Sequence, residues 1–224
     1  TVPLGAEVTG AFLSEDGDLF FNVQHPDSNN AIPGGDGKVI NAGAVGVLTG
    51  VDFNKLPNNL VSSPVPVSDT EKQTVMTAYG QYQILGQTND VFNSLPKGLG
   101  NTYAVDGTTL VVENHNPDYN GYIETADNEG YLFTNWEHRM GGMSRMKLSK
   151  DAESGLWSVD SDDVMMLDFG KYGTAANCFG SVTPWNTPLS SEEWGGPGEA
   201  TYNWNNPEEI GDSAIFAAYT APGE

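Results

Sequence analysis

The chain has 224 residues, enough for one domain with a sizeable core, and its 30 acidic against 9 basic side chains give a net charge of −21. Such a charge repels phosphate backbones and anionic lipid surfaces, so it argues against nucleic-acid binding. No apolar run approaches the ~18 residues that a membrane-spanning helix needs. The single cysteine, Cys178, excludes an internal disulfide.

Short apolar stretches between turn-forming residues run along the chain, which has 27 glycines and 13 prolines. This pattern predicts an all-β fold. The one helix that we expect lies at 69–80, with Ser68 as its N-cap. The clearest hairpin is expected from strands at 143–148 and 156–159, joined by a turn at 149–155.

A repeat is visible in which a glycine precedes an apolar stretch and then a histidine, eight residues later each time. The pairs are Gly17 and His25, Gly107 and His115, and Gly130 and His138. A weaker fourth copy runs from Gly180 to the pair Glu192 and Glu193. Repeated strands with polar ends at one face are typical of a β-propeller. We therefore expect a single β-propeller or partial β-propeller with long loops.

Cys178 is the first candidate for chemistry. A lone cysteine is most often a small buried hydrophobe, whereas acidic neighbours in space make it a thiolate metal ligand. Glu192 and Glu193 follow 14 and 15 residues later, which suits a return to the same face. Paired carboxylates bind hard cations such as calcium, although they also form solvated acidic rims. Cys178, Glu192 and Glu193 are the predicted metal ligands.

Three further polar groups are expected at strand ends. One combines Asn114, His115, Asn116 and Asp118, a second Glu137 and His138, and a third Gln24, His25 and Asp27. The histidines either bind a metal or hydrogen-bond the next repeat. The chain has no glycine-rich phosphate loop, no G-x-S-x-G elbow and no H-E-x-x-H motif.

The sequence NCFGSVTPWNT at 177–187, followed by SEEW at 191–194, resembles the PhoX-type alkaline phosphatases. Their signature has Asn-Cys, then Thr-Pro-Trp-Gly-Thr, then Cys-Glu-Glu. Shorter similarities lie at 65–69, 112–115 and 141–144, so the resemblance spans about 65 to 194. Asn116 stands where the family has a glutamate, and Ser191 stands where it has a cysteine. Chains of the family are about twice as long or more.

The resemblance implies a β-propeller that hydrolyses phosphate esters with calcium and iron in an extracellular, periplasmic or lumenal setting. It implies that Cys178 is the thiolate that bridges two irons, and that Glu192 and Glu193 lie at the metal face. Residues 1–26 resemble the closing blade of the family, 27–64 form a loop-rich linker, and 65–224 form the PhoX-like blades.

Two functions follow as expectations. The first is a calcium- and iron-dependent phosphomonoesterase acting on a phosphate ester. The second is a non-catalytic propeller, a structural or interaction subunit that binds calcium or a protein partner completing the ring. The short chain, Asn116 and the presence of only two arginines, Arg139 and Arg145, favour the second, since phosphate sites commonly use arginine.

Overall fold

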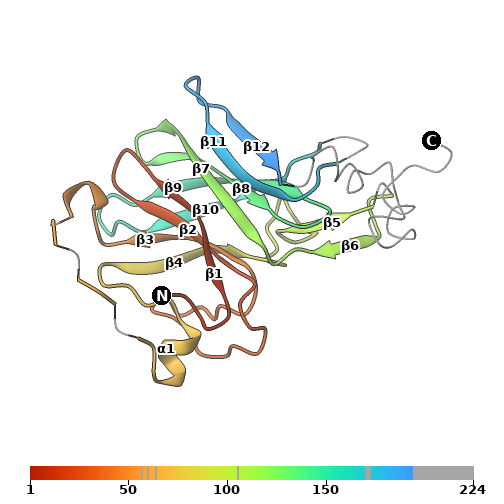
Figure 1. Cartoon of the computed structure of the whole chain (residues 1–224). Coiled ribbons are helices and arrows are strands. Elements are labelled where there is room, and N and C mark those ends of the chain that lie inside the picture. The colour runs from red at the N-terminus through yellow and green to blue at the C-terminus, as the bar shows by residue number, and fades with distance from the viewer. Residues whose placement is uncertain (57, 60, 64, 105, 170–172, 194–224) are drawn as a thin grey trace.

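The computed structural model describes residues 1–56, 58–59, 61–63, 65–104, 106–169 and 173–193. The rest of the chain, including residues 194–224 of the expected last blades, lies outside the described residues. The described part is mostly β, as the turn-rich sequence predicts, and its strands form antiparallel sheets (Figure 1).

The first sheet contains four strands in chain order, β1 (Glu7–Leu13), β2 (Leu19–Gln24), β3 (Ala44–Thr49) and β4 (Gln81–Gln87). All six residues of β3 are buried, because this strand is central and apolar on both faces. The range 27–64, expected to be a loop-rich linker, therefore supplies a central strand. Because β4 completes the same sheet, the expected boundary between residues 64 and 65 runs through one sheet.

The second sheet repeats this pattern with β7 (Pro117–Ala126), β8 (Glu129–Trp136), β9 (Gly142–Lys150) and β10 (Trp157–Met166), again neighbours in chain order. The hairpin predicted between 143 and 159 is confirmed. It is longer than predicted, and Lys150 pairs with Trp157 across its turn.

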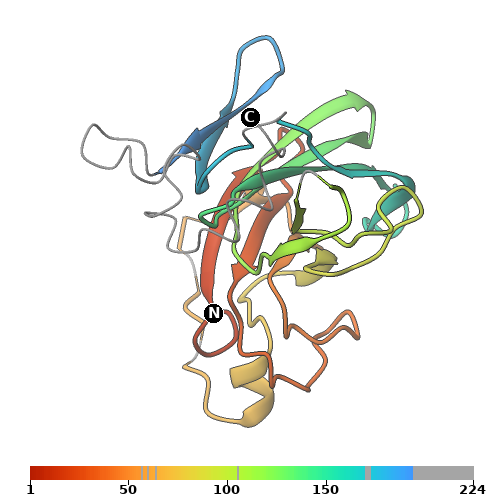
Figure 2. The same ribbon diagram turned by 90° about the vertical axis from the view of Figure 1, so that its right-hand side faces the viewer.

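Two smaller hairpins complete the described strands, β5 (Asn101–Tyr103) with β6 (Leu110–Glu113) and β11 (Asn177–Val182) with β12 (Pro188–Glu192). Gly17 lies just before β2 and Gly130 is the second residue of β8, the second strands of the two large sheets, whereas Gly107 lies before β6 in a small hairpin. The glycine–histidine spacing therefore marks equivalent places in only two of its three copies. Figures 1 and 2 show the first strands β1, β7 and β11 gathered in one region of the molecule.

The one α-helix of the described residues is α1 (Asp69–Gln73), and these residues also contain a short 3₁₀ turn, η1 (Phe53–Lys55). Ser68 caps α1 as predicted, and Glu71 closes a capping box with it. The helix is shorter than the predicted 69–80, because Thr74 is already extended and a β-branched residue, Val75, follows. None of the described helices is long and apolar enough to span a membrane.

The main core lies between the two large sheets. Phe20 of β2 stacks on Tyr122 of β7 with ring centroids 5.2 Å apart, and its edge contacts Trp157 of β10 at 5.3 Å. Val47, Leu85, Leu132, Met146 and Leu148 surround these rings. Burial of this apolar surface is the main force that joins the sheets.

The outer edge of the first sheet is closed by a loop. Asp36 accepts a hydrogen bond from the backbone N–H of Ile84 at 2.8 Å, and the Lys38 ammonium donates to the carbonyl of Ile84 at 2.9 Å. Side chains thereby satisfy both backbone groups of this buried β4 residue. The edge is therefore covered without a fifth strand.

Candidate metal centre

Three acidic side chains from distant parts of the chain converge where β7, β8 and β11 meet. The ligand atoms of Asp118, Glu137 and Cys178 all lie within 4.8 Å of one another, and each residue is partly buried. Glu193 is close enough to hydrogen-bond Glu137. We call Asp118, Glu137, Cys178 and Glu193 the acidic cluster.

Equivalent positions of successive sheets supply these side chains. Asp118 is the second residue of β7 and Cys178 the second residue of β11, and a bulge interrupts the pairing of both strands there. Glu137 directly follows β8, and Glu193 directly follows β12. A bulge re-aims the side chains beside it, which explains how both strands present this position to a shared space.

The backbone repeats the same equivalence. The N–H of Glu137 donates to the carbonyl of Asn116 at 2.8 Å, and the N–H of Glu193 donates to that of Ala176 at 3.0 Å. Asn116 directly precedes β7, as Ala176 precedes β11. Each carboxylate is thus placed at the cluster by a backbone hydrogen bond to the residue that precedes a first strand.

Buried carboxamides hold the backbone at the cluster. Asn22 donates to the carbonyl of Asp118, and Asn135 donates to the carbonyl of Cys178 at 2.9 Å. Both asparagines are fully buried. Asn22 lies five residues after Gly17 and Asn135 five after Gly130, so each second strand reaches the first strand of the following sheet in the same way.

A third carboxamide contacts the cluster itself. The Gln24 side chain donates to Oε2 of Glu137 at 3.2 Å. Gln24 lies seven residues after Gly17, as Glu137 lies seven after Gly130. The repeat therefore places a neutral amide in the first sheet where the second sheet has a carboxylate.

Burial and the neighbouring acids both disfavour ionisation in the cluster, and burial has the larger effect. Burial, together with the neighbouring Asp118, Glu137 and Glu193, raises the pKa of the Cys178 thiol to about 12. Burial and the hydrogen bond with Glu193 raise the pKa of Glu137 to about 7, against the opposing hydrogen bond from Gln24. The cluster therefore holds protons that a bound cation would displace.

The predicted ligands separate into two groups. Cys178 and Glu193 both belong to the acidic cluster. Glu192 instead accepts a hydrogen bond from the backbone N–H of Ala175 at 2.7 Å. Adjacent residues of an extended chain point in opposite directions, which accounts for the split.

The predicted polar groups at strand ends are divided. Asp118 joins Cys178, whereas Asn114 is buried and accepts from the backbone N–H of Asn116. Glu137 enters the cluster, whereas the Nδ1 atom of its neighbour His138 accepts from the N–H of Met140. His25 instead contacts Glu7 at 3.5 Å.

Sequence reasoning named Asp118 and Glu137 but did not group them with Cys178. The signal that could have done so is the position before each histidine of the repeat, where Gln24 and Glu137 align. The other pair, Asp118 and Cys178, occupies the second position of β7 and of β11.

A cavity of about 410 Å³ opens beside the cluster, between the first strands of three sheets. Its walls include Gly10 and Phe12 of β1, Asp118 and Tyr119 of β7, and Phe179 of β11. Asp118 thus links the acidic cluster to a space large enough for a small molecule.

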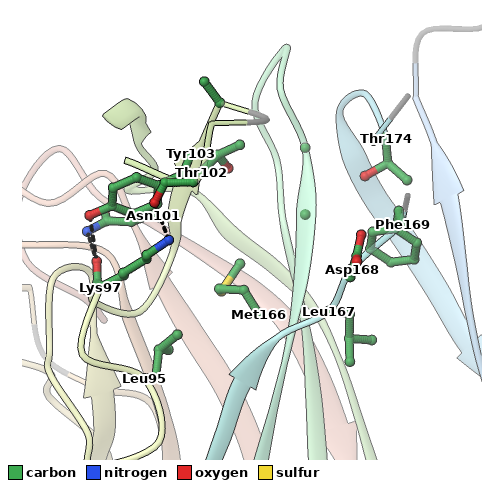
Figure 3. A pocket seen from close by; sticks show the side chains of 15 residues that line it. Leu95, Lys97, Asn101, Thr102, Tyr103, Met166, Leu167, Asp168, Phe169 and Thr174 are labelled. Atoms are coloured by element: carbon green, nitrogen blue, oxygen red, sulfur yellow. Dashed lines mark hydrogen bonds between the residues drawn. The ribbon is translucent and has the colours of Figure 1, made fainter. Parts of the chain in front are cut away.

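A larger cavity of about 570 Å³ lies apart from the cluster residues, between the β5–β6 hairpin and the end of β10. Figure 3 shows Lys97 and Tyr103 on one side and Asp168 and Phe169 on the other. The Lys97 ammonium donates to the carbonyl of Gly107 and lies 4.8 Å from the centre of the Tyr103 ring. This lysine is therefore engaged by the protein itself.

Comparison of the chain with models of protein families, with curated proteins and with solved structures found no match.

Proposed function

We propose that the protein is a metal-dependent phosphomonoesterase of the PhoX type, with its cations held at the acidic cluster. The observation that carries this proposal is the convergence of Asp118, Glu137 and Cys178 within 4.8 Å from three separate strands. Cys178 belongs to the segment whose sequence resembles the PhoX signature, so the resemblance and the geometry point to the same residue.

The donor set fits the cations that the resemblance implies. Carboxylate oxygens are the ligands that calcium prefers, and a thiolate is a soft ligand suited to iron. The acidic cluster combines one thiol with three carboxylates. A cation bound there would also favour the ionised forms of Cys178 and Glu137, whose pKa values are raised by burial and by the neighbouring acids.

When bound, cations at this site would supply positive charge that offsets the negative charge of a phosphate ester. The chain's own residues would fix those cations, with Cys178 and Asp118 on first strands and Glu137 and Glu193 at the ends of second strands. The neighbouring cavity provides the approach for the ester. A secreted, periplasmic or lumenal location is part of the same proposal.

A partial β-propeller is the architecture that we propose for the described residues. Support comes from two successive four-stranded sheets, each in chain order, and from β11 and β12, which begin in the same manner. Strand β7 packs against both β1 and β11, as first strands do around a propeller axis. Further blades, from a longer chain or a protein partner, would complete the ring.

A specific observation favours the alternative of a non-catalytic, cation-binding scaffold subunit. Arg145 is held by Asp163 at 2.5 Å and stacks over the Tyr131 ring at 4.7 Å. This arginine therefore serves the packing of β8, β9 and β10 rather than the binding of a phosphate. Arg145 would then take no part in binding a phosphate.

Metal analysis combined with a phosphatase assay tests the two functions. We expect purified protein to contain calcium and iron and to hydrolyse p-nitrophenyl phosphate, and Cys178→Ala to lose both the iron and the activity. Ser158→Ala, an exposed change on strand β10 that lies outside both the acidic cluster and the neighbouring cavity, is the control and should retain both. Calcium without hydrolysis would support the scaffold instead, and hydrolysis unchanged in Cys178→Ala would exclude the proposed role of the thiol.

A further inference from the structure

Gln24 is the neutral member of a set of equivalent positions. Glu137 follows the second strand of the second sheet and Glu193 follows the second strand of the β11–β12 hairpin, whereas Gln24 ends the second strand of the first sheet. Gln24 is 4 % exposed, although glutamine is ordinarily a surface residue. Its burial therefore requires an explanation beyond packing.

We propose that Gln24 is a positioning residue that orients the Glu137 carboxylate toward a cation in the acidic cluster. This inference rests on the proposed metal centre. It adds a residue that is not among the predicted metal ligands.

The first step of the argument is the hydrogen bond. The Gln24 side-chain N–H contacts Oε2 of Glu137 at 3.2 Å. A carboxylate fixed through one oxygen presents the other in a defined direction. Partners of this kind, which bind a ligand rather than the metal, commonly set metal affinity by 10–100-fold, roughly.

The second step concerns charge. The acidic cluster already brings three carboxylates and a thiol together. A carboxylate in place of Gln24 would add a further negative charge to this group, whereas the amide contributes a donor at no cost in charge. A neutral donor is therefore the side chain that steadies Glu137 without increasing the repulsion.

The third step is the anchoring of β2. Asn22, two residues before Gln24 and on the same face of the strand, donates to the backbone of Asp118 and accepts from Asn120 at 2.8 Å. The strand that carries Gln24 is thus fixed to the strand that carries Asp118. The position of the amide relative to the cluster is set by this attachment.

The test is a titration of the full chain with Co²⁺, whose thiolate complexes absorb characteristically in the near ultraviolet. We expect Gln24→Met to bind Co²⁺ about 10-fold more weakly than the unchanged protein and to alter the position or intensity of the thiolate band. Gln24→Glu, which keeps the length of the side chain but replaces the amide donor, should alter the same band.

Gln83→Met is the matched control. Gln83 bonds the backbone of Trp157 through both its amide nitrogen and oxygen, at 2.6 and 3.0 Å, away from the cluster. Its loss should lower stability and leave Co²⁺ binding unchanged. If Gln24→Met and Gln24→Glu bind Co²⁺ with the affinity and spectrum of the unchanged protein, the positioning role is wrong and the metal centre stands. If the unchanged protein shows no thiolate band, the metal centre and this inference both fail.

Discussion

One face of strand β2 connects two regions of opposite character. Phe20 lies in the aromatic core between the two large sheets, whereas Asn22 and Gln24 lie two and four residues later on the same face. We call the buried carboxamides Asn22, Gln24, Asn120 and Asn135 the polar seam. The core contains few polar atoms and is held by burial. The seam is held by buried carboxamides and ends at a cluster of acidic groups.

The core and the polar seam therefore contribute differently to the folded structure. Apolar packing supplies the free energy that keeps the sheets together, and this surplus tolerates a group of mutually repelling acids a few residues away. The seam fixes the geometry of these acids without neutralising them. The following predictions separate the two regions, beginning with the core.

Phe20→Ala should reduce the free energy of unfolding by about 3–5 kcal/mol, because the side chain is fully buried against Tyr122 and Trp157. Denaturant unfolding followed by tryptophan fluorescence measures this loss. Val8→Ala, an exposed change on the neighbouring strand, should alter stability by less than about 0.5 kcal/mol. Equal effects of both changes would contradict the assignment of the core.

The Cys178 thiol should react with iodoacetamide at pH 8 at least about 100-fold more slowly than an ordinary cysteine, because its pKa of about 12 leaves little thiolate. Mass spectrometry of the metal-free protein over time gives the rate. Labelling of the same chain in denaturant is the control and should be fast. Rapid labelling of the folded protein would show that the seam does not suppress ionisation of the thiol.

Asn22→Ala should cost about 1–3 kcal/mol of stability, since it removes the donor to the Asp118 carbonyl and leaves the Asn120 amide without an acceptor it now uses. The midpoint of chemical unfolding reports this effect. Asn29→Ala, at an exposed turn, is the matched control and should be close to neutral. An undiminished midpoint for Asn22→Ala would mean that the seam does not contribute to joining the sheets.

Glu137→Gln should stabilise the metal-free protein at pH 8 by about 1 kcal/mol once solvent screening is included. Burial and Glu193 raise the folded-state pKa of Glu137 to about 7, above its unfolded value of 4.5. The folded state therefore holds the proton more tightly, so this contribution to stability is complete below about pH 4.5 and is lost as the pH rises through about 7.

Thermal melting at pH 5 and pH 8 checks this sign. The unchanged protein should lose stability between these values relative to Glu137→Gln, and a cation bound at the cluster should reverse the loss. A pH dependence identical in the two proteins would place the Glu137 carboxyl outside the repulsive group.

Local features of the fold were predictable from the sequence. The β character, the β9–β10 hairpin and the Ser68 cap each depend on residues close in the chain. The repeat is visible in the sequence, but the contacts at the cluster come from residues that precede its histidines. Asn22 and Asn135 bond the backbone of the next sheet, and Gln24 bonds Glu137. The length of α1 was overestimated because the extended backbone at Thr74 depends on surrounding structure.

The candidate site was predictable only in part. Cys178 stood out as a lone thiol beside a motif, and Glu193 as its acidic neighbour. The pairing with Asp118 and Glu137 requires β7, β8 and β11 to meet across many residues of intervening chain, and local patterns do not encode such contacts. The different directions of Glu192 and Glu193 depend on where β12 ends.

The loop that covers the edge of β4 has a consequence for self-association. A strand of another molecule can extend a sheet only where a backbone donor and acceptor are both available, and Asp36 and Lys38 occupy this pair at Ile84. The first sheet therefore cannot grow at this point into an intermolecular stack. Removal of both side chains would turn a closed margin into a template for aggregation, even though the buried core of the protein would remain unchanged.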